Sequence, residues 1–211
     1  MKLLCDLRSS FNAVRNQGRR MTCLSFAASA SHERAVGSKE LLSVEYLFYH
    51  SVMKMPNANP DDGTTLVATK SALSLEGQPL ENVWPYEPCQ AYGTEWVPPD
   101  CANEIYRVEM DLIPPSVDAA KSFLDQNCAV ILGLVITDAF YRCDTQGHLP
   151  RMQTDMDRAG HAIVAVGHGI DGNSDYLLVR NSWGPEWGLG GHAWLSSEYL
   201  GSQMFEMAVV A

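Results

Sequence analysis

The chain has 211 residues, of which 46% are apolar, enough for a sizeable hydrophobic core in one or two folded units. Its formal net charge of −10 argues against nucleic acid or another polyanionic surface as a partner. No apolar run approaches the roughly 18–20 residues of a membrane span, so the sequence predicts none.

The first half of the chain is predicted to be mostly helical. A helix is expected over about 23–35, with Thr22 as its N-cap. Apolar residues at helical spacing predict a second helix over about 43–53. Residues 57–63, rich in Pro, Asn and Asp, are typical of a loop, and a third helix is expected over about 64–75.

The second half is predicted to be mostly strand. A helix capped by Ser116 is expected over about 117–126. Because helices come first and strands later, the sequence favours an α+β fold with segregated helical and β parts. Alternating or continuously apolar stretches predict strands over 106–112, 129–136, 161–166, 176–180, 192–195 and 205–210.

Three short motifs carry residue types that work together in one kind of chemistry. A thiol, an imidazole and an amide, in this chain order, are what a thiol-based acyl-transfer enzyme needs. The motifs read Gln17-Gly18-Arg19-Arg20-Met21-Thr22-Cys23, Gly160-His161-Ala162 and Asn181-Ser182-Trp183-Gly184. Cys23 and His161 lie 138 positions apart, within the roughly 130–150 typical of papain-type enzymes. On these motifs and this spacing the chain resembles the papain-like cysteine peptidases.

This resemblance covers nearly the whole chain and implies a fold. It implies a single domain over 1–211 with a helical lobe at about 8–107. An antiparallel β-barrel-like lobe follows at about 108–207 and includes the N-terminal residues, and the active site lies in the cleft between the lobes. The stretches 61–65 and 84–86 look more like prokaryotic members of the family than like animal or plant members.

The resemblance also implies a role for each motif residue. Cys23 is the nucleophile, and the helix that begins there favours its thiolate form. His161 is the acid and base, paired with Cys23 as an imidazolium in the resting state. Asn181 orients the imidazole, and Trp183 covers their hydrogen bond from water. Gln17, together with the backbone N–H of Cys23, forms the oxyanion hole.

Substrate-binding positions are expected at four residues, some of which depart from the family pattern. Relatives bind the substrate backbone through a Gly-Gly pair, whereas Gly63 is followed here by Thr64. Gly160 stands where an Asp often precedes the catalytic His, and Trp183 completes the set. Met21, bulkier than the Gly usual at its position, is expected to narrow the approach to the nucleophile.

The arginines before the nucleophile leave two interpretations open. Arg19 and Arg20 are either solvated loop residues that pair with nearby carboxylates, or one of them borders the leaving-group side of the cleft. In the second case that arginine would favour acidic substrate residues just after the cut bond.

Cysteine usage favours a reducing compartment. With Cys23 as a free nucleophile, five of the six cysteines remain, an odd number. A Cys that is disulfide-bonded in secreted relatives is replaced by Arg20. Cys89 and Cys101, in one irregular loop, are the best disulfide candidates. Because residues 1–6 are too short for a signal-peptide core, the protein is expected to be cytoplasmic, unless a leader lies outside this sequence.

No metal or cofactor is predicted. The sequence has no Cys-x-x-Cys and no His-Glu-x-x-His motif. His148, His168 and His192 show no ligand spacing and are expected to be structural or exposed.

The expected function is hydrolysis of peptide bonds through a thioester, with endopeptidase activity as the default. Two alternatives remain open: an impaired papain-like module that binds a peptide or partner in the old cleft, and a transferase that uses the same triad with an acceptor other than water. The expected partner is a peptide or protein substrate, and the sequence does not predict the oligomeric state.

Overall fold

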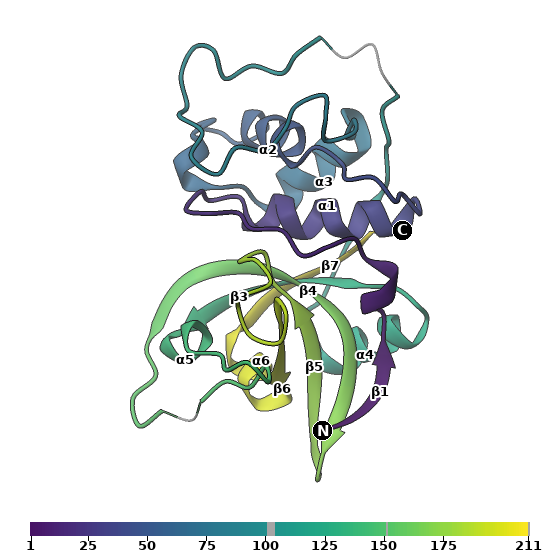
Figure 1. The fold of residues 1–211 in the computed structure, drawn as a ribbon, viewed down its shortest axis with the longest axis vertical. Coiled ribbons are helices and arrows are strands. Elements are labelled where there is room, and N and C mark those ends of the chain that lie inside the picture. Colours follow the sequence, from purple (N-terminus) through teal and green to yellow (C-terminus); the bar gives the residue numbers. More distant parts are fainter. Residues whose placement is uncertain (101–103, 151, 211) are drawn as a thin grey trace.

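The computed structural model describes residues 1–100, 104–150 and 152–210, and it has a helical lobe stacked on a β lobe (Figure 1). The sheet order is β2-β7-β3-β4-β5-β6, with β1 paired to β4, and all pairings are antiparallel. The predicted α+β fold class is therefore confirmed. The helices are α1 (Cys23–Ala35), α2 (Val44–Met53), α3 (Leu66–Leu75), α4 (Val117–Asp125), α5 (Asp138–Tyr141) and α6 (Ser197–Gln203), with 3-10 helices at Arg8–Ser10 and Pro60–Asp62. The strands are β1 (Lys2–Asp6), β2 (Met110–Ile113), β3 (Val130–Thr137), β4 (Asp157–Asp171), β5 (Ser174–Arg180), β6 (His192–Ser196) and β7 (Met204–Val210).

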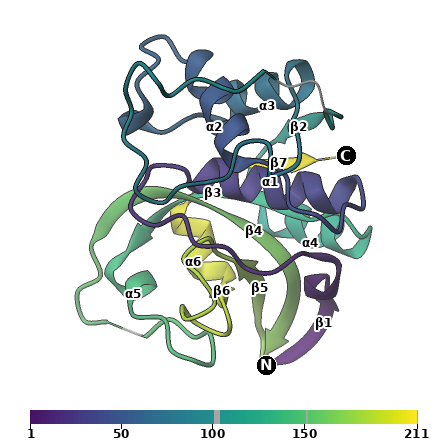
Figure 2. The same ribbon diagram turned by 45° about the horizontal axis from the view of Figure 1, so that its top comes forward.

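Helix α1 lies between the other two helices of its lobe and the sheet, as both views show (Figures 1 and 2). Small residues such as Ala27, Ala28 and Ser29 are buried along it, which lets the sheet approach its backbone closely. Because α1 is covered on both sides, its polar residues are buried too, and it lacks a clean amphipathic pattern. Among the described residues, no helix is long and apolar enough to cross a bilayer.

The strand expected over 106–112 begins only at Met110. Tyr106 instead forms an isolated antiparallel bridge with Gln78, and the Arg107 Nε donates to the Leu75 carbonyl at 3.1 Å. This segment crosses from one lobe to the other, so its first residues find backbone partners in the helical lobe. The alternating pattern was correct for only part of the range.

Four features of the β lobe were not predicted. Strand β1 is exposed along most of its length, so its sequence shows no inward-facing pattern. Strand β4 extends well beyond the apolar centre that predicted it, because its first residues are exposed yet still pair with β3. Helices α5 and α6 are too short to produce a periodic signal.

Thr22 stands at the N-cap position of α1, but its side chain caps nothing. Its Oγ1 lies 2.8 Å from the hydroxyl of Tyr86 instead, so the Thr22 side chain hydrogen-bonds to another loop and does not cap the helix. Ser116, in contrast, caps α4 as predicted by accepting from the Ala119 N–H. The expected pairing of Cys89 with Cys101 involves Cys101, which lies outside the described residues.

Arg20 is not the solvated loop residue that the first interpretation expected, because its side chain is buried, but it does pair with a nearby carboxylate. Its side chain is 5% exposed and forms a two-pronged ion pair with Glu45, at 2.5 and 2.6 Å. It also donates to the hydroxyl of Tyr92 and to the carbonyl of Glu87. The indole N–H of Trp96 donates to Glu45 at 2.7 Å, so both charges are well partnered. Arg19 is exposed, and no part of the structure tests its role.

Removing one partner of this pair should strongly destabilise the fold. Arg20→Met leaves the Glu45 carboxylate buried without its cation, and we expect a loss of roughly 3–5 kcal/mol in the free energy of unfolding. Denaturant unfolding measures this loss. The matched control is Arg19→Met, which replaces an exposed arginine and is expected to lie within about 0.5 kcal/mol of the parent. Equal stabilities for the two variants would contradict the assignment.

Candidate active site

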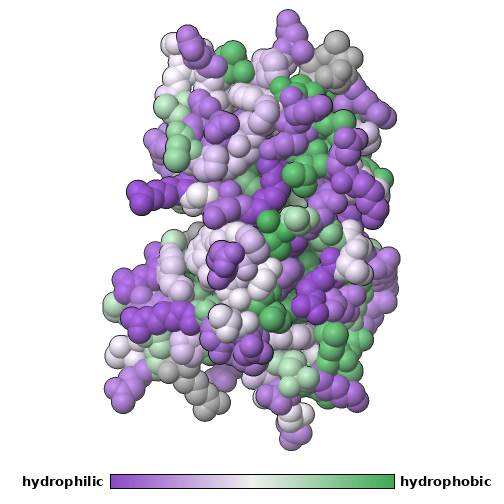
Figure 3. All heavy atoms as spheres, viewed as in Figure 1, coloured by the Kyte–Doolittle hydropathy of each residue, from purple (hydrophilic) through white to green (hydrophobic). Residues whose placement is uncertain are grey.

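The two lobes are joined by a backbone contact that also holds the candidate site together. The Gln17 N–H donates to the Ser182 carbonyl at 2.8 Å, and Asn16 forms a β-bridge with Trp183. The Ser182 hydroxyl donates to the Gln17 side-chain carbonyl at 2.6 Å. The loop before α1 is thereby fixed against the end of β5. In the space-filling view the surface is drawn inward at the level where the lobes meet (Figure 3).

Cys23 is the first residue of α1, where unpaired backbone N–H groups favour a negative charge. The hydroxyl of Tyr86 donates to the Gln17 carbonyl at 2.7 Å and contacts Thr22, so the loop that leads to Cys23 is held at both ends. Burial raises the pKa of the Cys23 thiol, and the backbone N–H of Ala162, the residue after His161, acts to lower that pKa as a hydrogen-bond donor.

His161 on β4 faces Asn181, which directly follows β5. The His161 Nε2 lies 2.8 Å from the Asn181 Oδ1. The Ser182 N–H also donates to that Oδ1 at 2.8 Å, which identifies the atom as the carbonyl oxygen of the amide. The Nε2 must therefore be the donor, and in the neutral ring the lone pair is on Nδ1. This tautomer leaves one ring nitrogen free to exchange a proton with a thiol.

Aromatic rings enclose the His161–Asn181 hydrogen bond. The ring centroid of Trp183 lies 5.0 Å from that of His161, and Phe140 lies 5.7 Å away in an edge arrangement. Tyr141 stacks on Trp183 at 5.2 Å. His161 and Asn181 are both buried as a result. The cover keeps water from competing for the hydrogen bond, so the imidazole keeps one orientation.

Gln17 is buried, and its side chain is held at both polar atoms. Its Nε2 donates to the Arg20 carbonyl at 2.8 Å, while its Oε1 accepts from Ser182. An amide nitrogen has two hydrogens, so one remains for another acceptor. Its position six residues before Cys23 and its fixed orientation suit an oxyanion donor.

The four expected substrate-binding residues lie in different settings. Gly63 has a φ of +74°, and a Cβ there would lie 3.1 Å from the Met21 carbonyl, so it packs against the loop before the nucleophile. Thr64 is half-buried and contacts Thr69 through their hydroxyls at 3.3 Å. Gly160 is exposed and has open space where a side chain would be. Trp183 lies against His161 with the two rings tilted by 37°.

Burial acts against a charge on either member of the Cys23–His161 pair when each is considered singly. Burial raises the pKa of the Cys23 thiol, while the backbone N–H groups of Ala162 and Leu24 act in the opposite direction. Burial lowers the pKa of His161 to about 4, opposed by its hydrogen bond to Asn181. Burial therefore favours the neutral form of each residue taken singly.

One charged residue near the site was not predicted. Ala162 pairs with Gly133 on β3, which pairs in turn with Glu206 on β7. Cross-strand neighbours point to the same face. Glu206 is partly buried, has no hydrogen bond or ion pair within the described part of the chain, and burial raises its pKa. Glu206 lies near Ala162 only because of the strand register across β4, β3 and β7. No motif in the sequence indicates that register.

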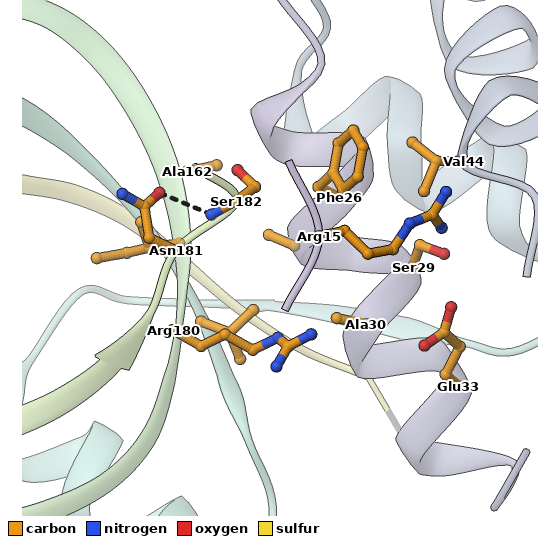
Figure 4. Close-up of a pocket in the computed structure, with 13 residues that line it drawn as sticks. Arg15, Phe26, Ser29, Ala30, Glu33, Val44, Ala162, Arg180, Asn181 and Ser182 are labelled. Carbon is orange, nitrogen blue, oxygen red and sulfur yellow. Dashed lines mark hydrogen bonds between the residues drawn. The ribbon is translucent and has the colours of Figure 1, made fainter. Parts of the chain in front are cut away.

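Behind the site, a pocket of mixed polar and apolar lining lies between α1 and the sheet (Figure 4). Phe26 and Glu33 of α1 line one side, and the Arg180 side chain points toward α1 from the other. The Glu33 carboxylate accepts from the Leu42 N–H at 2.9 Å, and the Arg180 guanidinium donates to the Ala13 carbonyl at 2.7 Å. Burial raises the pKa of Glu33 and lowers that of Arg180 to about 10. Two oppositely charged side chains thus face this pocket, each hydrogen-bonded to a backbone group.

Comparison with known proteins matches this chain to one family. The description "papain family cysteine protease" matches residues 4–211. Cathepsin J of Mus musculus is 29% identical over 212 residues, covering 88% of this chain and 57% of that protein. Cathepsin J of Rattus norvegicus is 31% identical over 200 residues, covering 84% and 54%. The chain thus spans about half the length of these curated relatives.

Solved structures share the fold. Xylellain, a cysteine protease from Xylella fastidiosa, superposes with a TM-score of 0.85 at 22% identity, covering 99% of this chain and 86% of that one. Digestive procathepsin L 3 from the larval midgut of Tenebrio molitor superposes with a TM-score of 0.76 at 22% identity, covering 98% and 69%. The expected papain-like two-lobe architecture is confirmed.

Alkylation of Cys23 should test whether the pair carries charge. Transfer of a proton from thiol to imidazole creates both charges together, so we expect alkylation to stay fast well below pH 7. In His161→Ala the rate should instead rise with pH as for a lone buried thiol. The measurement is the rate of iodoacetamide labelling between about pH 5 and 9, with modification mapped to Cys23. Identical pH profiles for the two proteins would contradict the pair.

Proposed function

The chain belongs to the papain family of cysteine proteases, and we propose that it hydrolyses peptide bonds through a thioester intermediate. The observation that carries this proposal is the hydrogen bond from His161 to Asn181, next to the segment whose backbone contacts Cys23. That bond fixes one tautomer of the imidazole, as general acid and base catalysis requires.

The proposed reaction has two halves, formation and hydrolysis of the thioester, and Cys23 and His161 act in both. The Cys23 sulfur attacks the peptide carbonyl, and the C–N bond breaks as His161 gives its proton to the leaving amine. A water then attacks the thioester, with His161 taking its proton, and the Cys23 sulfur leaves. Gln17 and the backbone N–H of Cys23 stabilise the oxyanion in both steps. Asn181 holds the ring and exchanges no proton.

The two alternatives are less well supported. A module that only binds peptides has no need for an imidazole held in one tautomer beneath an aromatic cover. A transferase needs a site for a second acceptor, and no separate observation in the described residues favours one. An epoxide thiol trap separates a reactive site from a binding module, and product analysis with added amines separates hydrolysis from transfer.

The decisive experiment is cleavage-site profiling of a complex peptide mixture with the parent protein and with Cys23→Ala. The parent should produce a defined set of new termini, and Cys23→Ala should produce none, while far-UV and near-UV circular dichroism of the two proteins agree. Cys143→Ala is a matched control, since this half-buried thiol lies outside the site. Equal cleavage by a highly purified Cys23→Ala protein would overturn the proposal.

Loss of the Gln17 amide should slow the chemistry without loss of binding. Gln17→Ala removes one preorganised donor, so we expect kcat to fall by roughly 10²–10³-fold with a much smaller change in KM. Ser182→Ala is the informative companion, because it leaves the amide present but removes the hydroxyl that orients it. A smaller decrease is expected there. An unchanged kcat in Gln17→Ala, measured when chemistry limits turnover, would remove Gln17 from the site.

Glu206 supports a preference for a cationic substrate side chain near the cut bond. Its carboxylate lies over Gly133, where a Cβ would be 2.7 Å from its Oε1, and no cation of the described chain neutralises it. Glu206→Gln should lower kcat/KM for peptides with Lys or Arg at the preferred position by roughly ten-fold, because a charged partner is replaced by a neutral one. Peptides with Leu there are the control and should change little. Equal changes for both peptide series would contradict this role.

A further inference from the structure

A second group of chemically reactive side chains lies in the β lobe, away from the candidate active site. Cys5 on β1 is paired directly with His168 on β4 in the antiparallel register. Asp125, the last residue of α4, completes the group. One ligand atom from each residue lies within 4.8 Å of the other two. These residues are far apart in sequence, so no motif spacing could reveal them.

The three side chains differ in mobility and access. The His168 side chain is 5% exposed, and its Nε2 lies 2.7 Å from the Asp125 Oδ1. Its Nδ1 is buried and has no partner within the described residues. The Asp125 side chain is 62% exposed, and Cys5 is partly exposed. The group therefore has one fixed member and an open side that an ion and water can reach.

We propose that Cys5, Asp125 and His168 form a Zn²⁺ site, with water as the fourth ligand. Sulfur, imidazole nitrogen and carboxylate oxygen are the donors that zinc takes in proteins, and the thiolate disfavours hard ions such as Mg²⁺ and Ca²⁺. Zinc bond lengths of roughly 2.0–2.3 Å place two ligand atoms of a tetrahedral ion about 3.3–3.6 Å apart. The three ligand atoms lie within 4.8 Å of one another, so binding needs a small rotation of the exposed Asp125 side chain and of Cys5, whose thiol donates to the Leu124 carbonyl at 3.4 Å.

The protons balance in a simple way. Cys5 binds as a thiolate and releases its proton to solvent. His168 binds as a neutral ring, and if Nε2 is the ligand its proton moves to Nδ1, the atom that has no partner. Asp125 binds through a carboxylate oxygen. Binding therefore releases one proton near neutral pH, which is measurable as a buffer-dependent heat.

The surroundings argue against a second nucleophilic site here. Burial together with the charges of Asp125 and Asp6 raises the pKa of the Cys5 thiol, so without a cation the sulfur stays protonated. A bound cation reverses this effect. It would also connect β1, α4 and β4, which lie together at one side of the β lobe (Figure 1). The site thus has a structural role in holding the N-terminal strand.

Zinc titration of the full chain tests the proposal. The parent for the titration carries Cys23→Ser, so that the nucleophile cannot act as a competing ligand. Calorimetry, with a chromophoric chelator as competitor, should show one Zn²⁺ per chain. Cys5→Ser, Asp125→Asn and His168→Gln should each weaken binding by at least about ten-fold. Co²⁺ in place of Zn²⁺ should give a sulfur-to-metal absorption band that Cys5→Ser lacks.

Matched controls separate this site from adventitious binding. Cys89→Ser removes an exposed thiol, and His148→Gln removes an exposed histidine whose Nδ1 lies 4.0 Å from Asp144. Both should bind Zn²⁺ as the parent does. Cys5→Ser is nearly isosteric, and Asp125 is largely exposed, so these two variants keep the test valid even if His168→Gln fails to fold. Absence of stoichiometric binding, equal affinity in the ligand variants, or a Co²⁺ spectrum without the sulfur band would overturn the proposal.

Discussion

The pairing of Gln17 with Ser182 is the contact on which the candidate site depends. The nucleophile and the base belong to different lobes, so their separation is only as fixed as the joint between those lobes. Here the joint is part of the site: Gln17 precedes Cys23 by one short loop, and Ser182 directly follows Asn181. The hydroxyl of Ser182 also orients the Gln17 amide. A displacement of one lobe would therefore disturb the oxyanion donor and the imidazole together, because the backbone hydrogen bond between Gln17 and Ser182 fixes the position of both.

The loop between Gln17 and Cys23 is held by charge where secreted relatives use a disulfide. Arg20 occupies the position of the missing cysteine and reaches Glu45 on α2. A buried ion pair is costly to desolvate, and it can be tolerated only if the remaining donors and acceptors are satisfied. Tyr92 and Trp96 provide that satisfaction, and the guanidinium also lies over aromatic rings, 4.6 Å from the centroid of Tyr86. The ion pair thereby fixes this loop to α2 without a covalent link.

The sequence predicted features that depend on interactions between residues close in the chain. It missed features that depend on contacts between distant residues. Helices α1, α2 and α4 were predicted because periodicity and caps are local, and Cys23, His161 and Asn181 because each lies in a recognisable short motif. Arg20 was misinterpreted because its partner is 25 residues away and nothing local marks it as buried. Glu206 and the Cys5–His168 pair depend on strand register, which a shift of one residue would reverse. The N-terminal strand β1 was missed because an exposed edge strand is fixed by its partner, not by its own pattern.

Burial has opposite consequences for single charges and for charge pairs in this molecule. Taken singly, a thiolate at Cys23 or an imidazolium at His161 is disfavoured by loss of hydration, and the directions of both pKa changes reflect that. A proton passed between them leaves the net charge of the site unchanged, and the two new charges attract each other more strongly in a dry environment than in water. The aromatic cover over His161 therefore penalises loss or gain of a proton to solvent far more than transfer within the pair. The same rule applies to the buried ion pair of Arg20 with Glu45, whereas burial raises the pKa of Glu206, which has no cationic partner among the described residues.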